Sequence, residues 1–214
     1  DNSKVQEAIF SSLFPKHPYG TQTVLGTQEN LKNPSITNIK NYYKQWYVPN
    51  NMAICMSGDL DPDATIALID KYFGGLKPNP ELPKLDLPKE APITQPVVKE
   101  VLGPDAESVA LAWRFPGVSD KDFEILQVVS QVLYNGKAGL IDLDLNQQQK
   151  VLNSYGYPMG LADYSALLLG GLPKQGQTLE EVKDLLLSEI KKLRAGEFDE
   201  KMLEANINNF KLGE

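Results

Sequence analysis

Residues 17–76 decide the fold of this chain, and they read HPYGTQTVLGTQENLKNPSITNIKNYYKQWYVPNNMAICMSGDLDPDATIALIDKYFGGL. The first helix-like run in this stretch ends at Pro49, because proline disfavours helical backbone in the residue before it. The short apolar run at 52–57 is bounded by turn residues, which predicts a buried strand. Asp61 then caps a second helix, and Gly74 ends it. The stretch therefore predicts a helix, a buried strand and a helix in that order.

The apolar side chains of this stretch have the spacing of a helix face, so we expect them to point into a core. On the first helix they are Ile39, Tyr42, Tyr43 and Trp46, and on the second they are Ile66, Ile69, Tyr72 and Phe73. Cys55, the one cysteine, is expected as a small core residue of the strand, and a single cysteine excludes an intrachain disulfide. His17, the one histidine, lies in a predicted loop and is expected at the surface.

The composition is that of an ordinary globular protein. Of the 214 residues, 42% are hydrophobic and 23% are charged, which is enough apolar content for a core. The formal charge is −7 and the pI is near 4.9, and no cluster of Lys and Arg offsets this acidic balance. Every apolar run is shorter than the ~20 residues that a membrane-spanning helix needs. We therefore expect neither nucleic acid nor a membrane among the partners.

Prolines recur between residues 77 and 96 and mark a boundary in the chain. No helical or alternating pattern accompanies them, so we predict an extended linker over 77–96. The linker separates a first part, residues 1–76, from a second part, residues 97–214. Helical spacing reaches both ends of the chain, so we expect both ends to be cut from a longer protein.

The sequence of the second part, residues 97–214, predicts both strands and helices. Strands are expected at 97–102, 107–115, 151–160 and 161–169. Helices are expected from Ser119 to Gly136, at 139–150, from the capping box Thr178–Glu181 to Leu193, and from Asp199 onward. Asp142, Asp144 and Asn146 alternate like calcium ligands, but the run lacks the glycine and the distal glutamate of a calcium loop. We interpret these three residues as a solvated helix face.

The order of elements in residues 17–76 resembles the segment just downstream of the zinc site in the pitrilysin/insulinase metallopeptidases. These enzymes are the inverzincins, whose signature is His-x-x-Glu-His. The resemblance implies an α+β fold made of two incomplete metallopeptidase-like (LuxS/processing-peptidase-like) repeats, each a mainly antiparallel sheet with helices packed on one face. Residues 1–76 would be the C-terminal part of a first repeat, and residues 97–214 a second repeat truncated at its C-terminus.

The resemblance continues in the second repeat, where the sequence QVVSQ (127–131) precedes VLYNG (132–136). In the family, the zinc-binding helix reads His-x-x-Glu-His followed by Met/Val-Leu-Phe/Tyr-x-Gly. The flanking positions match one by one. The resemblance therefore places Gln127 and Gln131 at the two ligand positions and Ser130 at the position of the general base.

These residues are unsuited to catalysis by zinc. A catalytic zinc needs three N, S or carboxylate-O ligands, and a neutral amide is a poor substitute for imidazole. Ser130 does not accept a proton from water near neutral pH as a glutamate does. The third ligand of the family, a glutamate, would fall in the stretch 206–213, which contains no carboxylate. We expect no catalytic residue, metal ligand or cofactor in this chain, and zinc only in an upstream catalytic repeat, if one is present.

The first hypothesis is a catalytically inactive module of a zinc metalloendopeptidase that acts on peptides. The resemblance implies that such modules wall a closed chamber and hold an extended peptide beside the active repeat. The second hypothesis is a non-peptidase partner or assembly subunit of an oligomeric complex. The expected partners are accordingly the remaining repeats of the parent peptidase or a catalytic partner subunit, with a peptide substrate as a further ligand. A third reading, an unrelated α+β binding domain, predicts a fold without a duplicated repeat.

Overall fold

The computed structural model describes residues 2–23 and 25–213, and it divides them into two compact units. The sheet unit contains the residues up to Pro15 together with those from Ala91 onward. The helical unit is Lys16–Glu90. The two units are not the two repeats predicted from the sequence, which are separated by the linker 77–96. The division into repeats stays a prediction.

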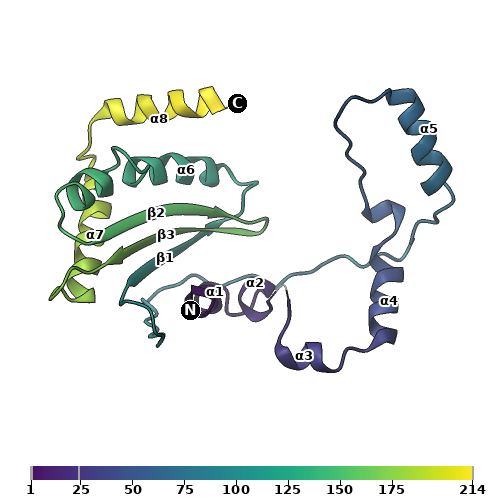
Figure 1. Cartoon of the computed structure of the whole chain (residues 1–214), viewed down its shortest axis with the longest axis horizontal. Coiled ribbons are helices and arrows are strands. Elements are labelled where there is room, and N and C mark those ends of the chain that lie inside the picture. Colours follow the sequence, from purple (N-terminus) through teal and green to yellow (C-terminus); the bar gives the residue numbers. More distant parts are fainter. Residues whose placement is uncertain (1, 24, 214) are drawn as a thin grey trace. The chain divides into compact units, whose positions relative to one another are not determined.

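A three-stranded antiparallel sheet forms the centre of the sheet unit, which confirms the predicted α+β class (Figure 1). The strands are β1 (Val109–Pro116), β2 (Asn153–Gly160) and β3 (Tyr164–Leu172), and β3 lies in the middle. Trp113 is opposite Leu167 in the β1–β3 register. Three of the four predicted strands are confirmed within a few residues. The fourth, at 97–102, is wrong, because this segment forms neither helix nor strand.

Helices α6 (Lys121–Leu133) and α7 (Leu179–Ala195) contact the sheet, and α8 (Glu200–Gly213) lies along α6 (Figure 1). Glycine on β2 allows the close approach of α6, because a Cβ on Gly160 would lie 2.6 Å from the ring of Phe123. The core lies between the sheet and these helices. It includes Leu126, Leu133, Ile141, Leu145, Leu167, Leu169, Val182 and Leu186.

Local hydrogen bonds explain where these helices begin and end. The predicted capping box of α7 is confirmed, since Thr178 Oγ1 accepts from the backbone of Glu181 and the Glu181 carboxylate accepts from that of Thr178. Gly196 ends α7 in the left-handed region, at φ 74°. Asp120 caps α6, one residue after the predicted Ser119.

The opposite face of the sheet is covered at one end by helix α1 (Asn2–Leu13) and the residues that follow it. Phe14 is fully buried, and its ring lies 5.6 Å from that of Tyr164 on β3. Arg114 on β1 donates to the carbonyl oxygens of Leu13 and Ala91. The side chain of Arg114 therefore ties two chain segments, far apart in sequence, to β1.

The predicted helix at 139–150 is short, and its central part is the π-helix η2 (Asp142–Asn146). Asp142 is buried, and its Oδ2 accepts from the backbone N–H groups of Asn135 and Gly139 at 3.0 Å each. The side chain of Asn146 bonds to Ser154 at the start of β2. The interpretation of these acidic and amide residues as a solvated face is therefore wrong. They organise the loop before β2, which a local pattern does not reveal.

The helical unit contains short helices and a long irregular segment. Its elements are α2 (Pro18–Thr21), α3 (Gln28–Lys32), α4 (Ile36–Trp46), η1 (Pro49–Asn51) and α5 (Pro62–Phe73). Ser35 and Asp61 cap the two main helices by accepting from backbone N–H groups three residues ahead, and the cap at Asp61 was predicted. The linker 77–96 has no helix or strand, in agreement with the prediction.

Burial in the helical unit differs from the predictions. Residues 52–57 form no strand, and Cys55 is exposed instead of buried in a core. The apolar faces of α4 and α5 are largely exposed, with no buried residue on either helix. The physical reason is that no strand is present among the described residues of this unit, so nothing pairs with 52–57 or covers the helices. The expectation that His17 lies at the surface is also wrong. His17 is buried, and its Nδ1 accepts from the N–H of Tyr19 at the start of α2.

No helix in the described part of the chain combines the length and the apolarity needed to cross a bilayer.

Candidate functional site

Helix α6 carries the three positions that the sequence singled out. Gln127 and Gln131 are half-buried, whereas Ser130 is buried. The side of α6 that faces the sheet carries Leu126 and Leu133 instead of the glutamines. A step of one residue along a helix turns the side chain by about 100°, so Gln127 and Gln131 do not point in the direction of these two leucines.

The donor set on α6 does not fit a zinc ion. Two amides and one hydroxyl supply neither imidazole nor carboxylate, and the ion prefers such charged or strongly basic ligands. Among residues 2–23 and 25–213, no three His, Cys, Asp or Glu side chains are grouped as metal ligands would be. Helix α6 therefore lacks the ligands for catalysis by zinc.

The hydroxyl of Ser130 is buried, and no described residue hydrogen-bonds to it. A buried polar group without a partner costs about 1–3 kcal/mol, and alanine also favours a helix interior more than serine. We expect Ser130→Ala to raise the free energy of unfolding by up to about 1 kcal/mol in urea denaturation. Gln127→Ala, at a half-buried position, serves as the control and should change stability by less than about 0.5 kcal/mol. A clear loss of stability in Ser130→Ala would show that the hydroxyl has a partner.

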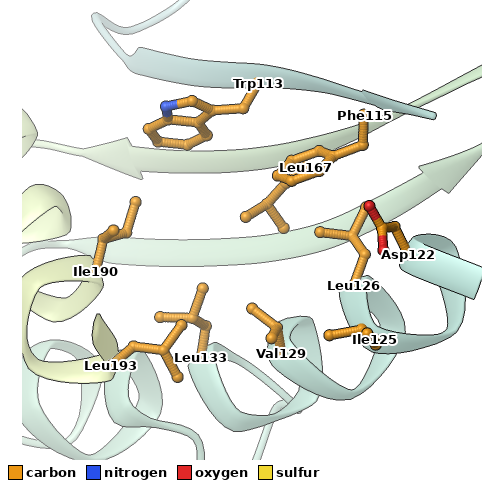
Figure 2. A pocket seen from close by; sticks show the side chains of 10 residues that line it. All are labelled: Trp113, Phe115, Asp122, Ile125, Leu126, Val129, Leu133, Leu167, Ile190 and Leu193. Carbon is orange, nitrogen blue, oxygen red and sulfur yellow. The ribbon is translucent and has the colours of Figure 1, made fainter. Parts of the chain in front are cut away.

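A cavity of about 360 Å³ lies between the sheet and helices α6 and α7 (Figure 2). Trp113 and Phe115 project into it from β1, and Leu167 projects from β3 (Figure 2). Its other walls are Ile125, Leu126, Val129 and Leu133 of α6 and Ile190 and Leu193 of α7, with Asp122 as the charged residue at its rim. Of the α6 residues, Leu126 and Leu133 are buried, Val129 is half-buried and Ile125 is 60% exposed. The cavity itself depends on pairing across the sheet and carries no local signal.

The two edges of the sheet differ. Among the described residues, β1 is hydrogen-bonded to a strand on one side, where it meets β3, and its outer edge has no neighbouring strand. The other edge is β2, which contains Pro158. Proline has no N–H to donate, so it weakens any further pairing at that edge. The β1 edge is accordingly the one suited to an added strand, and it adjoins the apolar cavity.

An ionic cluster connects η2 to α7. Lys192 Nζ lies 2.5 Å from Asp144 Oδ2 and 2.9 Å from Glu189 Oε1, and Glu189 is only 1% exposed. The hydrogen bond from Lys192 lowers the pKa of Asp144, and burial raises the pKa of Glu189. The i,i+3 spacing of Glu189 and Lys192 on one helix is a signal that sequence reasoning missed. With a lysine between the carboxylates, the cluster is an ion-pair site and not a metal site.

A family model described as "Peptidase M16 inactive domain" matches residues 35–210. The chain is 27% identical over 192 residues to the "Zinc protease PqqE" of Helicobacter pylori, covering 86% of this chain and 43% of that protein. It is 29% identical over 85 residues to a "Probable mitochondrial-processing peptidase subunit beta" of Schizosaccharomyces pombe, covering 40% of this chain and 18% of that protein.

Solved structures show the same fold. A protease from Helicobacter pylori superposes with a TM-score of 0.84 at 23% identity, covering 100% of this chain and 52% of that one. A chain in complex III2 from Candida albicans superposes with a TM-score of 0.71 at 17% identity, also covering 100% and 52%. The chain thus spans about half the length of the first relatives that it matches. The family model covers most of the sequence, and the chain belongs to the M16 peptidase family, within the part of it described as the inactive domain.

Proposed function

We propose that this chain is the inactive module of a zinc metallopeptidase, which forms part of a chamber wall and holds an extended peptide beside a catalytic repeat. The observation that carries the proposal is the residue set of α6. Gln127, Ser130 and Gln131 occupy the positions where the resemblance places two zinc ligands and a general base. A helix with amide and hydroxyl groups at these positions retains a structural role and lacks the groups that activate water.

The edge of β1 supports the holding of peptide. An extended segment that pairs with an open edge gains main-chain hydrogen bonds, and its alternate side chains enter whatever pocket lies beside the strand. Here that pocket is the apolar cavity beside Trp113 and Phe115. The preferred peptide would be extended, with apolar residues at alternate positions and a basic residue near Asp122.

Hydrogen exchange on the chain tests this proposal directly. An unstructured peptide of the preferred pattern should slow the exchange of amides in β1 and leave those of β2 unchanged, since Pro158 interrupts that edge. The peptide should also remain intact, and a chelator should make no difference, because the described residues include no group of three side chains that could hold zinc. The proposal fails if β1 gains no protection, or if the purified chain cleaves the peptide in a chelator-sensitive reaction. Metal analysis after dialysis against zinc should find well under one equivalent.

A second candidate function, a structural subunit of an assembly, is favoured by the exposed apolar surface of the helical unit. Ile36, Ile39, Ile54, Met56, Ile66 and Tyr72 are all exposed. Large exposed apolar patches mark interaction surfaces. One structural relative is a chain of complex III2, and others are proteases, so the family members with this fold include both kinds of protein. An intact His-x-x-Glu-His motif upstream in the parent would favour the peptidase, and its absence would favour the assembly subunit.

A further inference from the structure

The sequence contains one Asn-Gly pair, Asn135–Gly136, which follows the end of helix α6. Asparagine before glycine is the pair most prone to deamidation, because glycine has no side chain to hinder the attack of its backbone nitrogen on the asparagine side chain. Gly136 lies in the left-handed region, at φ 78°, where other residues are strained. Its identity therefore marks Asn135 as the most reactive asparagine of this chain.

In the folded chain, three hydrogen bonds hold the side chain of Asn135. Its Oδ1 accepts from the backbone N–H groups of Lys137 and Ala138, at 3.0 and 2.9 Å. Its Nδ2 donates to the carbonyl oxygen of Gln131, one turn back on α6, at 3.1 Å. Deamidation brings Cγ of Asn135 to bonding distance of the Gly136 nitrogen, so the carboxamide has to leave the position in which these bonds fix it. The folded loop therefore opposes the reaction.

Asp142 of η2, which is 5% exposed, closes the backbone of the same loop. Its Oδ2 accepts from the N–H groups of Asn135 and Gly139 at 3.0 Å each, so one carboxylate oxygen joins both ends of the loop that follows α6. Gln147 adds a hydrogen bond from its Nε2 to the carbonyl oxygen of Lys137. All of these residues belong to the sheet unit, so the closure of the loop does not depend on any other part of a longer protein.

We propose that Asn135 is a deamidation site of this chain, that Asp142 keeps it closed, and that it reacts when the loop opens locally. In the reaction, the Gly136 nitrogen loses its proton and forms a bond to Asn135 Cγ, and the amide group takes up a proton and leaves as ammonia. Water then opens the five-membered imide. Attack of water on the side-chain carbonyl gives aspartate, and attack on the main-chain carbonyl gives isoaspartate. The proposal does not rest on the proposed function.

The products of deamidation favour the open loop. A carboxylate at position 135 has no N–H to donate to the carbonyl oxygen of Gln131, and the two oxygens repel each other. Isoaspartate also inserts a carbon atom into the main chain between the two N–H groups that Asp142 holds. These groups then no longer match a single carboxylate oxygen. The modification therefore turns a loop that opens briefly into one that stays open.

Mass spectrometry tests the site, with the chain and a synthetic peptide of residues 129–141 incubated side by side at mildly alkaline pH. Digestion then shows how much of position 135 has become aspartate or isoaspartate, and the Asn135→Asp variant supplies the standard that separates the two. We expect the peptide to react at least about tenfold faster than the folded chain, because several hydrogen bonds must break before the folded chain reacts. Equal rates in the peptide and the folded chain would overturn the proposal.

Asp142→Ala and Asp144→Ala form a matched pair of variants on η2. Asp142 holds the loop, whereas Asp144 contacts Lys192 on α7. We expect Asp142→Ala to speed up the conversion of Asn135 by about tenfold or more, and Asp144→Ala by less than about twofold, since hydrogen bonds to a carboxylate are among the stronger ones. The proposal fails if the two variants convert Asn135 at the same rate.

Low concentrations of urea provide a measurement that needs no variant and remains decisive should Asp142→Ala fail to fold. Local opening exposes little surface, so the rate in the unchanged chain should stay nearly constant with urea below the unfolding transition. A rate that rises in step with the unfolded fraction would place the reaction in the globally unfolded chain and overturn the proposal.

Discussion

Leu186→Ala is expected to lower the free energy of unfolding of the sheet unit by about 3 kcal/mol. Leu186 on α7 is fully buried and lies over Gly171 of β3, where a Cβ would be 3.5 Å from Leu186 Cδ1. Truncation to alanine removes apolar contacts and leaves a hole, and glycine on the facing strand has no side chain that could move into it. Urea denaturation followed by the fluorescence of Trp113, in a Trp46→Phe background, reports the sheet unit.

The matched control is Leu152→Ala, which removes the same atoms from an exposed position. It should change the free energy of unfolding by less than about 0.5 kcal/mol. If the two substitutions cost the same, α7 does not pack on β3 in the way described.

Lys192→Met is expected to destabilise the sheet unit by about 2–3 kcal/mol at neutral pH. The substitution leaves the carboxylates of Asp144 and Glu189 close together without the ammonium group that lies between them. Glu189 is buried, so its charge loses a partner that water does not replace. Partial exposure of Lys192 and Asp144 limits the loss, since solvent already screens that half of the cluster. The same urea denaturation measures the effect.

The difference between the unchanged chain and Lys192→Met should depend on pH. Lys192 lowers the pKa of Asp144 from its ordinary 3.8, so the stabilisation from Asp144 is present above that value and is lost as the pH falls through the lowered pKa. Burial raises the pKa of Glu189 above its ordinary 4.5, so ionisation of Glu189 costs stability as the pH rises through the raised pKa. Lys192 offsets that cost. The difference should therefore be largest near neutral pH. It should begin to shrink above pH 4.5, as Glu189 becomes protonated, and the contribution of Asp144 should be lost only below pH 3.8.

The double variant Lys192→Met with Glu189→Gln isolates the buried charge. Glutamine keeps the shape of Glu189 and removes its charge, so the double variant should recover more than half of the stability lost in Lys192→Met. The pH dependence of the loss should also weaken. A double variant that is as unstable as Lys192→Met at neutral pH would show that the packing of the lysine stem, and not the charge, accounts for the loss.

Local sequence patterns predicted the regular elements of the sheet unit well. The capping box Thr178–Glu181 and the apolar spacing of α6 depend on residues within a few turns of each other, and both are confirmed. The π-helix was not predicted, because its geometry follows from distant contacts. Asn146 is fixed by Ser154, and Asp144 is fixed by Lys192 on another helix.

Burial was predicted less well than secondary structure. The run at 52–57 has the composition of a buried strand, yet it is exposed, because a strand exists only beside another strand that supplies its hydrogen bonds. Cys55 and the apolar face of α5 are exposed for the same reason. His17 shows the reverse error: a loop histidine was expected at the surface, and its ring lies buried 4.2 Å from that of Tyr19.

The sequence by itself determined the helices with their caps and, through its resemblance, the family, because these depend on residue identity and short-range spacing. The placement of Gln127, Ser130 and Gln131 at the positions of zinc ligands and base stays a prediction of that resemblance. Only the tertiary structure decided that β1, within the described residues, has no strand on its outer side and adjoins an apolar cavity, and that Glu189 is buried with Lys192. Each of these depends on which distant segment lies against which, and that is set by hydrogen bonding and packing between strands and helices rather than by the residues of any one segment.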